Sequence, residues 1–309
     1  MVRVRVQVPA TTANLGPGFD CLSLALGLYN EVTIESVEGG LEVVVEGTGS
    51  PSIPKDERNM VYRAARLVMA RLGVSVDGFK IRVLCRIPPA RGLGSSATAI
   101  VGGMLAANVL YGQELTRHEI LELAGQLEPH PDNLAPALFG GFTVAVRTGD
   151  SVDCVCLKPP PGLRVAAAVP RYELSTDDAR AVLPATVSHA DAVFNVGRTA
   201  LLVAGMAADK DKLFKAAMKD RLHHPYRAVL VPGLEEVLDA ATEAGALGAC
   251  LSGAGPTVVA LCRENEQTIA EAMCRAFREN GIEADPLVLD VDRSGATLVE
   301  ETGESDASG

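Results

Sequence analysis

The chain has 309 residues, of which 48% are hydrophobic and 22% charged, a composition typical of a globular protein with room for two modest domains. Its formal net charge of -11 argues against a nucleic-acid partner, because proteins that hold a phosphate backbone carry a basic face. The seven cysteines are scattered without a C-x-x-C pair, so we expect small apolar fillers rather than metal ligands.

The chain begins with MVRVRVQVPA, in which Val alternates with Arg or Gln. This alternation predicts a strand over residues 2–8 and is unlike the apolar run of a signal peptide. No later stretch approaches the roughly 18 apolar residues that a membrane helix needs. We therefore expect a soluble, cytoplasmic protein with no membrane partner.

The first half of the chain is predicted to mix strands with helices around one sheet. A Pro/Gly-rich loop at 9–18 follows the first strand. Runs rich in Val, Ile and Leu predict further strands at 22–36, 41–46 and 79–87 and a hairpin of 142–147 with 152–157. Helical spacing and capping residues predict helices at 57–72, from the serines 95–96 to about 110, and at 116–127.

The segment PPPG at 159–162 is the clearest boundary signal in the chain. It predicts an N-terminal domain at 1–160, a C-terminal domain at 161–300 and a polar tail at 301–309. In the second domain we expect strands at 163–169, 247–252, 257–262 and 286–291, and helices at 186–207, 209–220, 234–244 and 265–280. The order of these elements is that of a split βαβ sandwich with inserted helices, so the fold class is α+β.

One loop, PPARGLGSSAT, lies between a predicted strand and a predicted helix. Its two glycines let the backbone approach a ligand, and the helix that follows directs unpaired N–H groups and the positive end of its dipole at the loop, which suits a phosphate. It is not a Walker loop, since no Lys follows the glycines. The spacing Gly92-x-Gly94-x-x-Ala97 meets the loose dinucleotide pattern, but the four residues before Gly92 separate it too far from the strand for the tight turn that this pattern requires.

Four motifs in the same order over nearly the whole chain resemble those of the GHMP kinases, and within them the homoserine kinase family. PPARGLGSSAT is similar to the ATP-phosphate loop of these small-molecule kinases. The other three motifs are VPATTANLGPGFDCLSLAL at 8–26, LEPHPDNLAPALFGG at 127–141 and GACLSGAGPTVVAL at 248–261. The resemblance implies an N-terminal ribosomal-protein-like βαβ domain and a C-terminal ferredoxin-like split βαβ domain.

The resemblance also implies where ATP and Mg²⁺ bind. Ser96 and Glu128 match the magnesium ligands of the family, and hydroxyl and carboxylate oxygens suit that ion. Asn59 matches the residue on the adenine side, although an Asn at the start of a helix is also an ordinary cap. The remaining ATP-binding residues are those of the loop: Pro88, Pro89, Ala90, Arg91, Gly92, Leu93, Gly94, Ser95, Ser96, Ala97 and Thr98.

The acceptor is implied to be L-homoserine, a zwitterion that needs one anion and at least one cation around it. Asp20 resembles the residue that meets the amino group, and Arg180 and Arg227 resemble the pair that holds the carboxylate. Without the motifs around them, surface salt bridges would be the simpler reading of both arginines. The neighbouring Arg221, His223 and His224 are interpreted as structural supports.

Asn14 and Asn133 complete the implied acceptor site. Several GHMP kinases have a carboxylate where this chain has Asn133, and an amide cannot serve as a general base at neutral pH. The resemblance therefore implies catalysis by positioning, with Asn14, Asn133 and Arg180 as its catalytic residues; the adjacent Asp132 is a candidate base but more simply structural.

Two alternatives stay open beside this interpretation. One is a GHMP kinase with another acceptor, such as mevalonate or shikimate, against which Asn133 and the charges of Asp20, Arg180 and Arg227 count. The other is a GHMP-fold protein that senses a ligand without turnover, against which the intact phosphate loop and metal ligands count. The resemblance further implies a homodimer.

Overall fold

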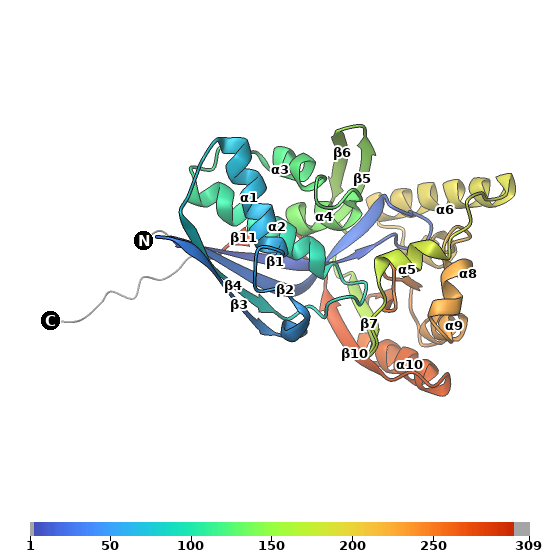
Figure 1. Ribbon diagram of the computed structural model, residues 1–309. Helices are drawn as coiled ribbons and strands as arrows, with labels where there is room; N and C mark the ends of the chain where they lie inside the picture. The colour runs from blue at the N-terminus through green and yellow to red at the C-terminus, as the bar shows by residue number, and fades with distance from the viewer. Residues whose placement is uncertain (1–2, 300–309) are drawn as a thin grey trace.

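The computed structural model describes residues 3–299 and contains two β-sheets, each covered by helices. The predicted tail at 301–309 lies outside the described residues. The larger sheet is built mainly from the first half of the chain and the smaller one from the second half, and the two lie side by side (Figure 1). The predicted α+β fold class is confirmed.

The larger sheet has the strand order β11-β1-β2-β4-β3, and β5 joins it by pairing with β2 and β6. Its neighbouring strands are antiparallel except for β3 and β4, which are parallel and joined through helix α1. The strands are β1 (Arg3–Ala13), β2 (Leu22–Val37), β3 (Gly40–Gly47), β4 (Gly78–Cys85), β5 (Phe142–Thr148), β6 (Ser151–Leu157) and β11 (Thr297–Leu298).

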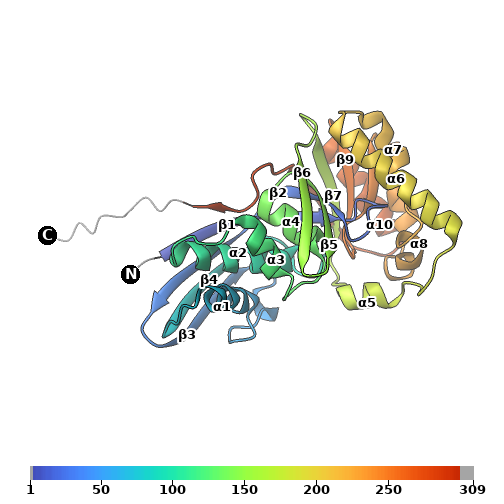
Figure 2. The same ribbon diagram turned by 90° about the horizontal axis from the view of Figure 1, so that it is seen from above.

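Four helices cover one face of this sheet (Figures 1 and 2). They are α1 (Met60–Leu72), α2 (Ser95–Leu110), α3 (Arg117–Ala124) and α4 (Pro131–Phe139). Helix α2 is apolar on all sides, because it packs on the sheet with one face and on α1 with another. Gly102 and Gly103 make these approaches possible, since a Cβ on Gly102 would lie 2.6 Å from the Val32 side chain and one on Gly103 would lie 2.5 Å from the Val61 carbonyl oxygen.

The smaller sheet has the antiparallel order β10-β7-β9-β8, which is the strand order of a ferredoxin-like split βαβ unit, as predicted. Helices α9 and α10 pack against β7, β8 and β9 through a shared apolar core. The strands are β7 (Arg164–Pro170), β8 (Gly248–Leu251), β9 (Val258–Cys262) and β10 (Ala284–Asp290). The helices are α5 (Thr176–Ala181), α6 (His189–Ala207), α7 (Phe214–Ala217), α8 (His224–Arg227), α9 (Leu234–Glu243) and α10 (Glu266–Glu279).

A second apolar core joins the two halves. Leu22, Leu24 and Leu26 of β2 pack in one buried cluster with Val165 and Val169 of β7. Such a continuous buried core fixes the two sheets relative to one another, so loops from both halves can form one site at their junction. Helix α5 lies at this junction in both views (Figures 1 and 2).

Some predicted boundaries differ from the structure. Strand β1 runs to Ala13 through the predicted loop, with a register shift between Pro9 and Ala10 that accommodates the proline. The helix predicted at 209–220 is a short 3-10 turn (Asp211–Leu213) followed by α7. Helices α4, α5 and α8 and strand β11 were not predicted. None of the described helices is long and apolar enough to cross a membrane.

Candidate active site

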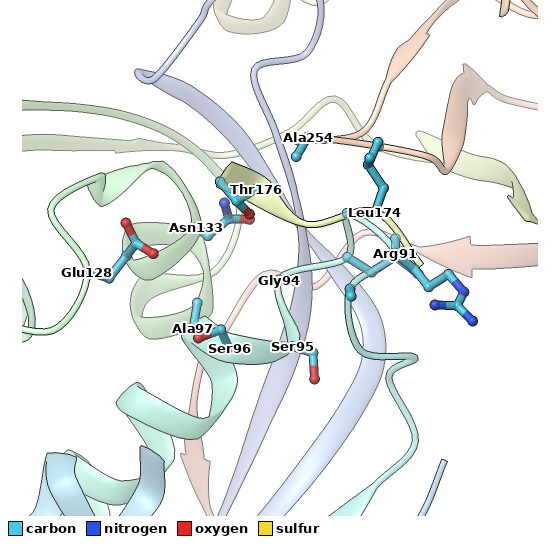
Figure 3. A pocket seen from close by; sticks show the side chains of 15 residues that line it. Arg91, Gly94, Ser95, Ser96, Ala97, Glu128, Asn133, Leu174, Thr176 and Ala254 are labelled. Carbon is cyan, nitrogen blue, oxygen red and sulfur yellow. The ribbon is translucent and has the colours of Figure 1, made fainter. Parts of the chain in front are cut away.

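The phosphate loop ends at the N-terminus of α2, where Gly94 takes a left-handed conformation with φ 71°. None of the described side chains caps this helix, so the first N–H groups remain available to a ligand. The loop borders a cavity of about 140 Å³ that is also lined by Glu128, Asn133, Thr176 and the turn at 253–255. In Figure 3 Glu128, Asn133 and Ser96 lie to one side of Gly94, and Arg91 points away on the other.

Three segments far apart in the sequence pack together here: strand β1, the loop and the 252–255 turn. The Leu93 carbonyl accepts from the Thr11 N–H at 3.1 Å, and the Gly92 carbonyl accepts from the Ser252 hydroxyl at 2.6 Å. A Cβ on Gly92 would lie 2.2 Å from the Ser252 carbonyl oxygen, and one on Gly94 would lie 1.9 Å from Thr11 Oγ1. The close packing of these segments therefore requires both glycines.

Ser96 and Glu128 both line this cavity of about 140 Å³, which we call the phosphate cavity. Glu128 Oε1 accepts from the His130 backbone N–H at 3.1 Å and lies 2.8 Å from His130 Nδ1, which leaves Oε2 for a ligand. Burial alone would raise the pKa of Glu128, but the hydrogen bonds from His130 outweigh it and hold that pKa below its usual value. An ionised carboxylate beside a hydroxyl fits a divalent cation bound next to phosphates.

An apolar cavity of about 370 Å³ adjoins the loop on the other side. Asn59 borders it, but its Oδ1 accepts from the Val61 N–H at 3.0 Å and so caps α1, while its Nδ2 donates to the Pro54 carbonyl at 2.7 Å. Only the second N–H of this amide is left for a purine edge. The cavity can hold a flat apolar ring, and the adenine contact of Asn59 stays a prediction.

The residues predicted to bind the acceptor meet at one small cavity of about 70 Å³ beside the phosphate cavity. We call it the acceptor cavity. They come from four parts of the chain: the loop after β1, the start of α4 with the residues before it, helix α5 and helix α8. Glu128 and Ala254 border both cavities, so an acceptor hydroxyl and a terminal phosphate would lie next to each other. The predicted residues in the lining are Asn14, Asp20, Glu128, Asn133, Arg180 and Arg227.

Asp20 and Arg180 both line this cavity and form a two-pronged ion pair. Arg180 donates from its two terminal nitrogens to the two Asp20 oxygens at 2.7 and 3.1 Å. Its Nε is buried without a hydrogen-bond partner among the described residues. The sequence predicts separate roles for these residues, on the ammonium and the carboxylate, whereas in the structure their charges neutralise one another.

Arg227 is 2% exposed and borders the acceptor cavity. Its Nε donates to the Ala179 carbonyl at 3.0 Å, and its NH1 donates to the Gly253 carbonyl at 2.9 Å and lies 3.3 Å from His223 Nδ1. Of its five N–H groups, only the two on NH2 have no hydrogen-bond partner among residues 3–299. Arg227 therefore offers a carboxylate one nitrogen, NH2, rather than two.

Two asparagines are fixed by the backbone and side chains around them. Asn14 has a left-handed φ of 71° and bridges two loops, with its Oδ1 accepting from the Asp20 N–H at 2.9 Å and its Nδ2 donating to the Gly253 carbonyl at 3.0 Å. Asn133 Oδ1 accepts from the Thr11 hydroxyl at 2.7 Å. That bond orients the amide so that the Asn133 amino group is the part left for an acceptor.

Asp132, next to Asn133, is 4% exposed and borders the acceptor cavity. Burial, and then the negative charge of Asp20, raise the pKa of Asp132 to about 7. This carboxyl group therefore titrates near neutral pH, which is the behaviour expected of a group held in place for a ligand or for proton transfer.

Replacing Asp132 by asparagine is expected to stabilise the fold above pH 7 but not at pH 4. Because the folded-state pKa lies above the usual Asp value, the protonated carboxyl is tolerated at low pH, and stability is lost as the pH rises from about 4 towards 7. A pKa unit corresponds to about 1.4 kcal/mol, so the gain should reach a few kcal/mol. Urea denaturation of both proteins at pH 4 and pH 8 measures it, and an equal difference at the two pH values would contradict the raised pKa.

Two residues of the site were not singled out from the sequence. His130 borders the acceptor cavity, and its hydrogen bond to Glu128 raises the pKa of His130. Thr176, the first residue of α5, borders both cavities. The signal for His130 was its place inside the motif LEPHPDN, whereas nothing local marks Thr176, which reaches the site only because α5 lies at the junction.

A larger cavity of about 670 Å³ lies among α6, α8 and α9. None of the predicted site residues lines it. Its lining mixes basic and acidic side chains, and it includes no residue of the phosphate loop.

Comparison with known proteins defines the class to which this fold and site belong. The sequence model of the family "GHMP kinases N terminal domain" matches residues 59–141, and that of the family "GHMP kinases C terminal" matches residues 202–279. The structure of Leishmania major mevalonate kinase superposes with a TM-score of 0.71 at 16% identity over 94% of this chain and 96% of that one, which shows a shared fold. The protein is thus built as a small-molecule kinase of the GHMP class, which implies the use of ATP.

Relatives of higher identity narrow the class. Homoserine kinase from Moorella thermoacetica is 46% identical over 95% of this chain and 99% of its own length. That from Carboxydothermus hydrogenoformans is 43% identical over 98% and 99%. The crystal structure of homoserine kinase from Cytophaga hutchinsonii has a TM-score of 0.88 at 35% identity, covering 96% and 97% of the two chains. The chain belongs to the homoserine kinase family, as its motifs predict.

Proposed function

We propose that the protein transfers the terminal phosphoryl group of ATP to the hydroxyl of L-homoserine, giving ADP, a proton and O-phospho-L-homoserine for threonine biosynthesis. The observation that supports this most directly is the pair of adjoining cavities. One is bordered by a phosphate loop at a helix N-terminus, and the other by an acid and two arginines that match the charges of an amino acid. The family relatives support the same substrate.

The chain's own residues account for phosphate binding. The uncapped N–H groups of α2 and the loop backbone face the cavity and can hold the phosphates without a lysine. The turn at 252–255 and β1 hold the loop by hydrogen bonds, so donors are already oriented when ATP binds. Adenine would lie in the apolar cavity beside Asn59.

Mg²⁺ would be held by Ser96 and Glu128. The ion would offset the negative charge of the phosphates when bound. His130 keeps Glu128 ionised and leaves one of its oxygens free for this purpose. The remaining ligands would be phosphate oxygens and water.

At the acceptor, Asp20 would bind the ammonium group, and Arg180 and Arg227 the carboxylate. Asn133, held by Thr11, would orient the hydroxyl oxygen for in-line attack, and Asn14 keeps the loop of Asp20 against Gly253. A loose phosphoryl-transfer transition state needs little help from a base, so positioning and charge neutralisation suffice.

A parallel assay of ATP consumption tests the substrate. L-Homoserine should be turned over with a kcat/KM far above those of mevalonate, shikimate and galactose. Two single-charge analogues, 4-hydroxybutanoate and 3-aminopropan-1-ol, should each have a kcat/KM roughly tenfold or more below that of L-homoserine, because each leaves a charge of the site without a partner. A higher kcat/KM for mevalonate or a sugar would overturn the assignment, and no turnover of any acceptor would favour a ligand sensor.

We further propose that the protein works in the cytoplasm as a homodimer, as the family resemblance implies. Light scattering of the purified protein tests the dimer, and a monomer at micromolar concentration would contradict it.

A further inference from the structure

A buried network of polar side chains lies behind Arg227, outside the lining of the acceptor cavity. At its centre is His223, which has no exposed surface and comes one helical turn before Arg227. Its ring stacks at a tilt on Phe19, with 5.2 Å between ring centroids, and the guanidinium carbon of Arg227 lies 5.3 Å from the centroid of the same Phe19 ring. His223 and Phe19 thus both pack against the arginine.

The two ring nitrogens of His223 have different partners. Nε2 lies 2.7 Å from the Gly16 carbonyl oxygen, which can only accept, so Nε2 carries the proton. Nδ1 then presents a lone pair, and it lies 3.3 Å from NH1 of Arg227, which can only donate. Burial, and then the neighbouring His224, lower the pKa of His223 to about 3, so the ring stays neutral and Nδ1 remains an acceptor.

Asp220 fixes the backbone that presents this histidine. Its Oδ2 accepts from the backbone N–H groups of His223 at 2.8 Å and His224 at 2.7 Å, and its Oδ1 accepts from Asn195 Nδ2 at 2.7 Å. The three side chains Asp220, His223 and His224 lie close enough to hold a metal ion. However, hydrogen bonds already occupy both carboxylate oxygens and both His223 nitrogens, so the cluster serves as a structural support.

We propose that His223 is a positioning residue for the acceptor, an inference that rests on the proposed function. With one nitrogen fixed on Gly16, it takes one N–H of Arg227, while Gly253 and Ala179 take two others. The guanidinium is thereby locked with its last nitrogen, NH2, left for the substrate carboxylate. His223 also ties the loop of Asn14 and Asp20 to the arginine, so both ends of the amino acid are held in register.

Two substitutions of His223 distinguish the contributions of its two ring nitrogens. In His223→Gln the amide reaches the Nε2 position and keeps the Gly16 bond but loses the acceptor for Arg227. In His223→Asn the amide oxygen reaches the Nδ1 position and keeps that acceptor. We expect the glutamine variant to raise the KM for homoserine about tenfold with the KM for ATP within twofold, and the asparagine variant to raise the KM for homoserine by less than about threefold.

The matched control is His224→Gln. The Nε2 of His224 accepts from the Leu251 N–H at 3.2 Å, a bond that glutamine can keep, and His224 has no hydrogen bond to Arg227 among the described contacts. The KM values of this control should match those of wild type.

A double substitution tests whether His223 acts through the arginine. When Arg227→Leu is already present, adding His223→Gln should change the KM for homoserine by less than about twofold, since its target is gone. An unchanged KM in the single glutamine variant, equal increases for both substrates, or a full tenfold increase on top of Arg227→Leu would each overturn the proposal.

A measurement on the wild-type protein does not depend on activity or on the folding of a variant. Nitrogen-15 NMR of histidine-labelled protein should show two histidines that stay neutral from about pH 8 to pH 5 and have opposite tautomers. His223 should carry its proton on Nε2, and His224, whose Nε2 accepts, should carry it on Nδ1. If His223 carries its proton on Nδ1, or if it becomes protonated in this range, it cannot hold Arg227 as proposed, whatever the substrate is.

Discussion

Replacing Asn133 by alanine is expected to lower kcat for homoserine by roughly two to three orders of magnitude, with the KM for ATP little changed. Thr11 fixes the amide oxygen of Asn133, so its amino group is left for the acceptor hydroxyl. Positioning of reacting atoms contributes several kcal/mol to such reactions. Asp132→Asn, one residue away, is the matched variant and should retain kcat within about tenfold.

Steady-state kinetics of wild type and both variants from pH 5.5 to pH 8 decides between positioning and general-base catalysis. The pKa of Asp132 is raised to about 7, so a base at this position would make kcat rise about tenfold per pH unit below pH 7 and level off above it. We expect no such rise. A folded Asp132→Asn protein that binds both substrates but loses about three orders of magnitude in kcat would identify Asp132 as the base.

Replacing Arg227 by leucine should raise the KM for homoserine roughly ten- to a hundred-and-fifty-fold and leave that for ATP nearly unchanged. The loss of a charge-assisted hydrogen bond to a carboxylate corresponds to about 1.5–3 kcal/mol. Arg227→Lys keeps the charge but cannot make all three protein contacts, so its effect should lie between those of leucine and wild type.

The same substitution also tests whether Arg227 has a structural role. Its contacts with the Ala179 and Gly253 carbonyls join α5 to the turn behind the phosphate loop. Loss of these bonds should lower the melting temperature, because the Ala179 carbonyl loses the donor that Arg227 supplies and the Gly253 carbonyl keeps only its bond from Asn14. If the KM values for homoserine and ATP rise equally, Arg227 supports the fold rather than the substrate.

Much of the fold could be predicted because its signals are local. Gly73 ends α1 in a left-handed conformation, and Thr116 with Glu119 forms the capping box that starts α3. Helix α4 was missed because Pro131 begins it and Pro136 lies within it, which hides the helical pattern. Helix α5 is only six residues long, too short for a periodic signal.

In the candidate site, too, the features with a local sequence signal could be predicted and those that depend on tertiary packing could not. The phosphate loop carries its own glycines and helix start, so its position at the N-terminus of α2 could be read from the sequence. The pairing of Asp20 with Arg180 joins residues 160 positions apart and depends on how the two sheets pack. Likewise, no local sequence pattern shows that three N–H groups of Arg227 donate hydrogen bonds to acceptors within the protein.

Under the proposed function, the ion pair between Asp20 and Arg180 would make substrate binding an exchange of partners. The two charges neutralise each other in the structure. A ligand that binds between the two side chains, as proposed, would have to replace the partner of each charge. A zwitterion would replace both partners at once, since its ammonium would take the place of Arg180 beside Asp20 and its carboxylate that of Asp20 beside Arg180. A molecule with one charge would replace only one of the two partners, so under the proposed function the ion pair itself would disfavour single-charge ligands relative to amino acids.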